Sequence, residues 1–311
     1  MNTPTQYTPA PAADFVLPFD IAPLGVRGRL VRLSDVSAEA LTAHKLPEAA
    51  ARVAAETLTL SALLGSSLKL DGRLTVQTKS NGALDLIAAD YYGAEAEGAR
   101  AAGLRATARA NDDAVKSLGA APSFTALAGS GSLAITIEPR VGGQTYQGIV
   151  ELSPDGIAAS AQTYFAQSEQ LPTVIRIAAA PLLVPGKPPS WRAGGMMLQS
   201  TAVEIRGDDG KSEIRNDDWE RVKLFLASVE DLELVDVSLA AEDLLWRLFH
   251  EDEVRVLPFE TLAFRCDCSG DRIASVLRSY PERDRAGLAD ADGIIRARCE
   301  FCGKTHEIAA A

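Results

Sequence analysis

The residues of this chain best suited to chemistry are four cysteines, and all of them lie close to its C-terminal end. They are Cys266, Cys268, Cys299 and Cys302, in the stretches FRCDCSG and ARCEFCG, and the first 265 residues contain no cysteine. Four thiolates suit tetrahedral Zn²⁺. A Cys-x-x-Cys pair followed by Gly303 is typical of a zinc knuckle, in which the glycine permits a positive φ. The spacing therefore predicts one Zn²⁺ per chain, held by these four residues.

The first cysteine pair leaves two interpretations of the site open. Paired ligands of structural zinc sites are commonly separated by two to four residues, whereas only Asp267 separates Cys266 from Cys268. The metal can stabilise a module too short to bury much core, and thiolates this close can also be oxidised to a disulfide. On the pattern alone, a purely structural zinc site is favoured over a redox switch.

Other polar residues near the cysteines are expected to play supporting parts. His306 lies close to the site, but four cysteines already complete a tetrahedral coordination sphere. His44 and His250 are interpreted as surface or helix residues, and no acid, base and nucleophile converge, so we expect no catalysis. A thioredoxin-like oxidoreductase would need a βαβ context that is missing around Cys299. Basic neighbours are expected to offset the negative charge of a four-thiolate site: Arg265, Arg296, Arg298 and Lys304.

Charge and hydropathy restrict the classes of partner. The 311 residues carry a formal net charge of −11, which disfavours binding to nucleic-acid phosphates. No run reaches the roughly 18 to 20 apolar residues of a membrane span. The N-terminal residues lack the basic and apolar regions of a secretory signal. We therefore expect a cytoplasmic protein that binds neither nucleic acid nor membrane, in a compartment where cysteines are metal ligands or redox-active thiols.

The pattern of elements that must position the cysteines predicts an α+β fold. Hairpins are expected around Asn81-Gly82 and Gly142-Gly143, and an alanine-rich helix is expected over 46–69 after Pro47. A further helix is expected over 155–173. The predicted organisation is a disordered tail at 1–14, an N-terminal, mainly antiparallel α+β domain at 15–205, a helical linker at 206–255 and a small C-terminal zinc module at 256–311.

Apolar side chains in the acidic linker follow a helical period. The interpretation favoured by the pattern is packing between helices. The alternative is an apolar surface that is covered only conditionally and then binds unfolded chains. The residues that would contribute to such a surface are Trp219, Phe225, Leu245, Trp246 and Phe249.

The chain as a whole resembles the heat shock protein 33 family of redox-regulated chaperones. The resemblance rests on FRCDCS…ARCEFCG together with VRGRLVRL, LKLDGRLTVQ, GSLAITI, YQGIVEL, YFAQSEQLPT, AGGMMLQ and LLWRLFHEDEVRV, in this order. It covers nearly everything after the tail. The tail itself and a proline-rich insert at 181–192 depart from the family pattern.

This resemblance implies a holdase that works without ATP. Reduced protein would hold zinc, and oxidation would release it and form the disulfides Cys266–Cys268 and Cys299–Cys302. The zinc module and linker would then lose order, and the oxidised protein, typically a dimer in that family, would bind unfolded clients. These implications favour the redox switch. The rival function is a zinc-ribbon protein that binds RNA or a protein partner without switching, which salt-dependent RNA binding would reveal.

Overall fold

The structure, a computed structural model, divides into two compact units, Met1–Phe264 and Arg265–Ala311. The residues that it describes are 8–68, 70–95, 100–186, 189–201 and 216–309. Parts of the predicted tail (1–7), proline-rich insert (187–188) and linker (206–215) lie outside these ranges. Within the described residues, no helix has both the length and the apolar character that crossing a membrane requires.

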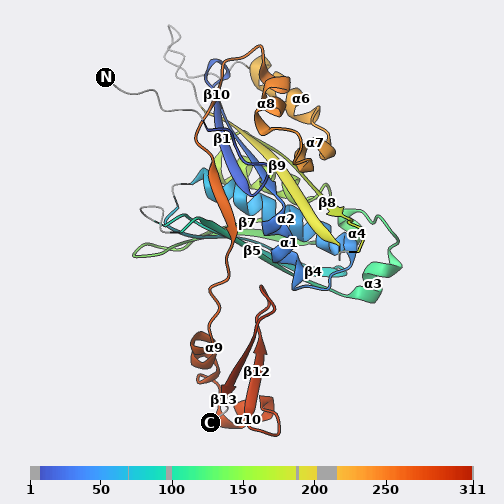
Figure 1. The fold of residues 1–311 in the computed structure, drawn as a ribbon, viewed down its shortest axis with the longest axis vertical. Coiled ribbons are helices and arrows are strands. Elements are labelled where there is room, and N and C mark those ends of the chain that lie inside the picture. Colours follow the sequence, from blue (N-terminus) through green and yellow to red (C-terminus); the bar gives the residue numbers. More distant parts are fainter. Residues whose placement is uncertain (1–7, 69, 96–99, 187–188, 202–215, 310–311) are drawn as a thin grey trace. The chain divides into compact units, whose positions relative to one another are not determined.

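A large curled sheet dominates the first unit, with strand order β7-β6-β3-β4-β5-β11-β1-β2-β9-β8 and β10 paired to β1 (Figure 1). Neighbouring strands are antiparallel except β11 and β5, which are parallel. The mainly antiparallel α+β fold predicted from the sequence is therefore confirmed. The strands are β1 (Phe15–Ile21), β2 (Val26–Leu33), β3 (Gly72–Ser80), β4 (Leu84–Tyr92), β5 (Ala102–Ala110), β6 (Gly131–Pro139), β7 (Tyr146–Glu151), β8 (Thr173–Leu182), β9 (Ser190–Ser200), β10 (Val254–Val256) and β11 (Glu260–Phe264).

The central helix of the first unit is α2 (Glu48–Ser67), which is buried along most of its length. Its small alanines allow close approach to the sheet, and its buried hydroxyls, such as Thr57, donate to carbonyl groups one turn earlier. The helix and the sheet together enclose the larger hydrophobic core. Further helical segments described before the linker are η1 (Ala22–Leu24), α1 (Asp35–Thr42), α3 (Asp112–Ser117), α4 (Phe124–Ala128), α5 (Ile157–Tyr164) and the π-helical turn η3 (Phe165–Glu169).

The linker helices α6 (Asn216–Ala227), α7 (Asp231–Val235) and α8 (Ala241–Phe249) cover the opposite face of β1, β2 and β9 (Figure 1). Successive side chains of β2 point to opposite faces of the sheet. Val31 packs in the hydrophobic core that contains α2, and its neighbour Leu30 packs in a second core, which contains the apolar side chains of the linker helices. The strands β1 and β2 are thus buried on both sides.

Two residues of the tail predicted for 1–14, Ala10 and Asp14, form hydrogen bonds with the rest of the first unit, and residues 1–7 lie outside the described residues. The Asp14 carboxylate accepts hydrogen bonds from the backbone N–H groups of Ser34 and Val36 at 2.9 and 3.1 Å. These bonds cap helix α1, whose own cap residue provides no side-chain acceptor. The N–H of Ala10 donates to Glu242 of α8 at 2.9 Å. Long-range hydrogen bonds therefore connect Ala10 and Asp14 to elements distant in sequence.

The second unit contains two short helices and one hairpin. They are α9 (Gly270–Leu277), α10 (Glu282–Leu288), β12 (Ile294–Arg298) and β13 (Thr305–Ala309). The sequence predicts a module from residue 256, whereas β10 and β11 pair with strands of the large sheet and the units divide after Phe264. Among the described residues of this unit, Ile295 is the one buried apolar side chain.

Candidate metal centre

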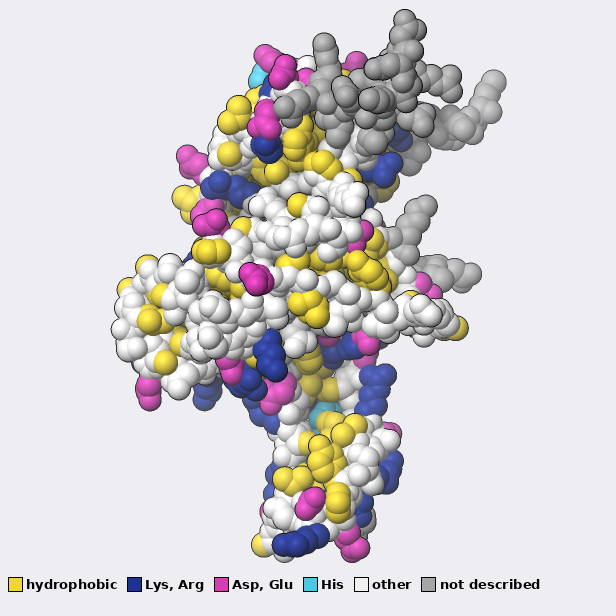
Figure 2. All heavy atoms as spheres, turned by 180° about the vertical axis from the view of Figure 1, so that it is seen from behind, with side chains coloured by type: hydrophobic (Ala, Val, Ile, Leu, Met, Phe, Trp, Pro, Cys, Tyr) yellow, Lys and Arg dark blue, Asp and Glu magenta, His cyan; other side chains and the backbone are white. Residues whose placement is uncertain are grey.

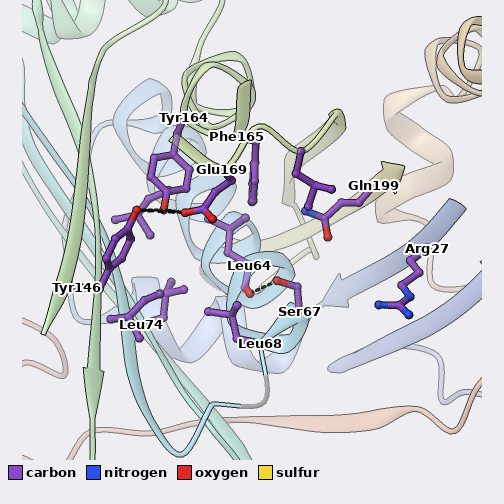
Figure 3. Close-up of a pocket in the computed structure, with 13 residues that line it drawn as sticks. Arg27, Leu64, Ser67, Leu68, Leu74, Tyr146, Tyr164, Phe165, Glu169 and Gln199 are labelled. Carbon is purple, nitrogen blue, oxygen red and sulfur yellow. Dashed lines mark hydrogen bonds between the residues drawn. The ribbon is translucent and has the colours of Figure 1, made fainter. Parts of the chain in front are cut away.

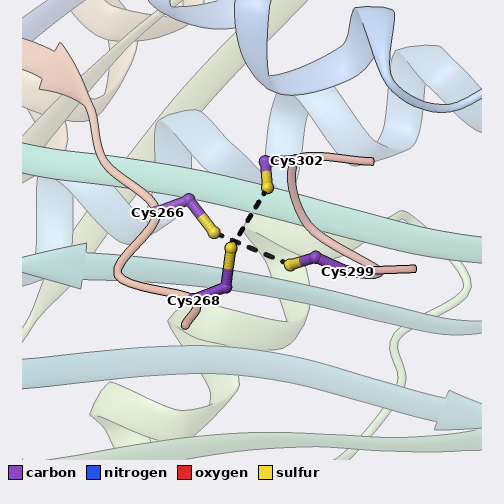
Figure 4. A group of neighbouring side chains, drawn as sticks. All are labelled: Cys266, Cys268, Cys299 and Cys302. Atoms are coloured by element: carbon purple, nitrogen blue, oxygen red, sulfur yellow. Dashed lines mark hydrogen bonds between the residues drawn. The ribbon is translucent and has the colours of Figure 1, made fainter. Parts of the chain in front are cut away.

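The structure brings all four cysteine sulfurs together, as the zinc prediction requires. The four Sγ atoms lie within 4.8 Å of one another (Figure 4). Cys266 Sγ is 3.7 Å from Cys299 Sγ, and Cys268 Sγ is 3.5 Å from Cys302 Sγ. Tetrahedral ligands with Zn–S bonds of about 2.3 Å would have sulfurs about 3.8 Å apart. The donor set and its spacing therefore fit Zn²⁺.

Local backbone structure explains how each pair is presented. Cys299 and Cys302 lie in the turn between β12 and β13, where Gly303 adopts a φ of 71°. The N–H of Gly303 donates to the carbonyl of Cys299, and the N–H of Cys299 donates to the carbonyl of Lys304, both at 2.9 Å. The first pair is held at the start of α9, where the Ser269 hydroxyl accepts from the N–H of Arg272 as the cap.

The thiols are electrostatically unequal. Burial and hydrogen bonding to the neighbouring sulfurs raise the pKa of Cys268 to about 12. Burial also opposes ionisation of Cys299, but backbone N–H groups of Cys302 and Phe301 donate to its sulfur and lower its pKa to about 7. Four thiolates this close repel one another unless a cation balances their charge. The arrangement is therefore suited to a bound metal ion.

His306 contributes a hydrogen bond beside the cluster. Its ring is buried, and its Nε2 lies 3.3 Å from Cys268 Sγ. The tautomer that carries a proton on Nε2 donates to the sulfur, which stabilises a thiolate there. This placement agrees with a supporting part for His306 next to four cysteine ligands.

Two of the basic residues expected to offset the thiolate charge already have carboxylate partners. Arg265 Nε lies 2.9 Å from the Asp267 carboxylate. Arg296 pairs with Asp290 and, at 3.1 Å, with Glu307. These carboxylates lie in the Cys266-x-Cys268 turn, before β12 and on β13, and the part of the arginines in balancing the thiolate charge stays a prediction.

The five linker residues predicted to form a client-binding surface are not equivalent. Leu245 and Phe249 are buried, and Trp219 and Phe225 are partly buried against the same core. Trp246 is 70% exposed and packs beside the ring of His250. In this structure the apolar side chains of the linker thus pack mainly in the core, as the pattern alone predicted. Trp246 is the exception among these five residues.

Polar contacts that no sequence pattern indicated also connect the linker to the sheet. The Arg32 side chain is buried, and its guanidinium donates to the carbonyls of Leu239 and, at 3.0 Å, Glu233. Arg176 of β8 pairs with Asp231 at the start of α7 at 3.0 Å. An arginine within an apolar strand is a weak signal, because its partners become evident only once the fold is known.

Comparison with known proteins agrees with this architecture. A curated relative from Caulobacter vibrioides (strain NA1000 / CB15N), named 33 kDa chaperonin, is 36% identical over 298 residues, covering 95% of this chain and 94% of its own. The 33 kDa chaperonin of Escherichia coli (strain K12 / DH10B) is 34% identical over 281 residues, covering 90% and 87%.

A solved structure shares the fold across both units. The crystal structure of the 33 kDa chaperonin (heat shock protein 33 homolog) from Thermotoga maritima matches with a TM-score of 0.73 at 18% identity, covering 96% of this chain and 95% of that one. The family model described as Hsp33 protein matches residues 14–309. The chain therefore belongs to the Hsp33 family.

Proposed function

We propose that this protein is a redox-regulated, ATP-independent chaperone that holds unfolding proteins and prevents their aggregation. Membership of the Hsp33 family and the name chaperonin of its relatives support the chaperone role. The observation that carries the regulatory part is the cluster of four sulfurs in a unit with a single buried apolar side chain among its described residues. Such a unit depends on its ligand cluster for order, so chemistry at the sulfurs controls its folding.

The proposed switch is the oxidation of all four cysteines. Bound Zn²⁺ would supply most of the folding free energy of the unit, roughly 10–16 kcal/mol for comparable modules. Each disulfide forms when two thiols lose two electrons and two protons to one peroxide molecule, which is reduced to two water molecules. Two peroxides thus convert four thiols to two disulfides. The sulfurs then no longer offer four thiolate ligands, and the site loses its metal.

The proposed pairing is Cys266 with Cys268 and Cys299 with Cys302. The shortest sulfur separations in the folded unit instead run between the pairs, at 3.7 and 3.5 Å. Once the unit loses order, however, partners separated by one or two residues meet far more often than partners 33 or 34 positions apart. The entropy of closing the longer loops costs roughly 2 kcal/mol more.

The proposed output of the switch is apolar surface. Loss of order after Phe264 would leave β11, which ends at that residue, without a folded continuation. Strand β11 lies in the same sheet as the strands that the linker helices cover. Release of those helices would expose Leu245, Phe249 and the sheet residues beneath them to unfolded clients. The face in Figure 2 shows basic and acidic side chains interspersed, without the basic stripe typical of nucleic-acid binding.

The test combines three readouts on one reduced, zinc-loaded sample treated with peroxide at a temperature that loosens the fold. We expect one Zn²⁺ released per chain, the disulfides Cys266–Cys268 and Cys299–Cys302 in peptide maps, and sedimentation as a homodimer. Release of zinc with crossed disulfides would contradict the pairing. Salt-sensitive RNA binding by the reduced form would favour the zinc-ribbon alternative. For the proposed cytoplasmic chaperone we expect no RNA binding.

A further inference from the structure

A cavity of about 570 Å³ lies in the first unit (Figure 3). Strands β3, β6 and β7 border it on one side, β2 and β9 on the other, and the C-terminal end of α2 lies between them. This volume is in the range of pockets that bind ligands. Its apolar lining includes Leu64, Leu68, Leu74, Phe165 and Ile137.

Hydrogen-bonding groups of opposite charge stand at its two ends. At one end, a single oxygen of Glu169 accepts from the hydroxyls of Tyr164 at 2.6 Å and Tyr146 at 3.2 Å. Burial raises the pKa of Tyr164, which keeps this hydroxyl a neutral donor. At the other end, across the apolar lining, the cavity is bordered by the solvent-exposed side chain of Arg27, and Gln199 lies opposite Arg27 in the β2–β9 register (Figure 3).

The backbone that presents Glu169 is irregular. Helix α5 passes into a π-helical turn at Phe165–Glu169, and the next residue, Gln170, has a φ of 51°. A π-helical turn is rare, often accompanies a functional site, and a left-handed non-glycine residue adds strain. The side chains of Phe165 and Glu169, the first and last residues of this turn, both contribute to the cavity lining.

The combination of groups selects an extended peptide. An apolar molecule would satisfy only the middle of the cavity. A peptide supplies an apolar side chain for the middle, backbone carbonyls for the donors of Arg27 and Gln199, and a basic side chain for Glu169. The net charge of −11 also favours basic partners.

We propose that this cavity binds an apolar side chain of an unfolded client, and that a lysine or arginine near it in the client pairs with Glu169. The site rests on the proposed chaperone function and gives it a preference, namely apolar residues with basic neighbours.

Two variants of the full-length protein test the site, each with a matched control. Glu169→Gln keeps an acceptor for both tyrosines and removes only the charge, and Glu151→Gln on exposed β7 is its control. Leu68→Trp fills the cavity from a side chain that is 41% exposed, and Leu183→Trp, 72% exposed and outside the lining, is its control.

The probes are two fluorescent glycine-serine peptides that contain Phe-Leu, followed in one by Arg and in the other by Glu. By fluorescence anisotropy, Glu169→Gln should weaken binding of the Arg peptide about 2- to 5-fold and should not weaken binding of the Glu peptide, whose carboxylate the wild-type charge repels. Leu68→Trp should weaken both roughly 10-fold or more. Unchanged affinities in both variants, or equal losses in the controls, overturn the proposal. The proposal is also overturned if Leu68→Trp leaves peptide affinity unchanged and only alters dimerisation in sedimentation. That result would indicate that the cavity binds a second copy of this chain.

Suppression of client aggregation by the oxidised wild type is measured in parallel. It distinguishes a failure of the cavity proposal from a failure of the proposed chaperone function. If the wild type suppresses aggregation but the cavity variants do not change peptide affinity, only the cavity proposal fails. If the wild type suppresses nothing while Glu169 still selects the Arg peptide, the chaperone function fails and the peptide site stands.

Discussion

Removing the metal from the reduced protein should unfold the second unit and leave the first intact. Within the described residues of the second unit, Ile295 is the one buried apolar side chain, and burying it contributes only about 1.5–3 kcal/mol. Zinc in comparable modules supplies roughly 10–16 kcal/mol. The backbone hydrogen bonds between β12 and β13 should therefore be lost once a chelator has removed the metal under reducing conditions.

Hydrogen exchange followed by mass spectrometry measures this directly. Amides of β12 and β13 should exchange slowly with zinc and rapidly without it, while those of β3 and β4 stay protected in both samples. Zinc added back should restore protection. Ile295→Ala serves as a matched variant, because its expected cost of about 2–5 kcal/mol leaves the zinc-loaded unit folded. Slow exchange in β12 and β13 after chelation would refute the reasoning.

Two further predictions concern the first unit. Phe249, 1% exposed and in ring contact with Phe225, anchors α8, so Phe249→Ala should lower the free energy of unfolding by about 3–5 kcal/mol in urea denaturation, whereas Trp246→Ala on the same helix should change it little. Equal losses would contradict the assigned packing. Burial, aided by Asp231, raises the pKa of Glu56 from 4.5 to about 7, so its stabilising contribution is present below pH 4.5 and lost as pH rises through 7. Glu56→Gln should thus match wild type at pH 4 and exceed its stability by up to about 3 kcal/mol at pH 8, and a difference independent of pH would count against this.

The elements predicted correctly from the sequence are those with local signals. Asn81-Gly82 connects β3 and β4, and the alanine-rich run forms α2. The helix expected over 155–173 is α-helical only over Ile157–Tyr164 and continues as a π-helical turn over Phe165–Glu169, a rare geometry that the apolar pattern does not signal. Strand β11 was missed because its five residues are fixed by pairing with β1 and β5, distant in sequence.

The metal centre was more predictable than the rest of the functional surface. Ligand spacing is a local property, so the sequence alone could specify all four cysteines. Arg32 under the linker and Glu169 beside the cavity acquire their meaning from partners on other elements. Phe249 is likewise buried because α8 packs on a sheet face. The helical period of the sequence predicts an apolar stripe but not the surface that covers it.

The central claim is that the state of four cysteines controls chaperone activity. The most direct measurement is light scattering from a thermally unfolding client protein, in the presence of reduced, zinc-loaded protein or of the same protein after peroxide treatment. We predict that only the oxidised sample suppresses aggregation and that a thiol reductant reverses the effect. Equal behaviour of the two samples would contradict it and would make the zinc site a structural element alone.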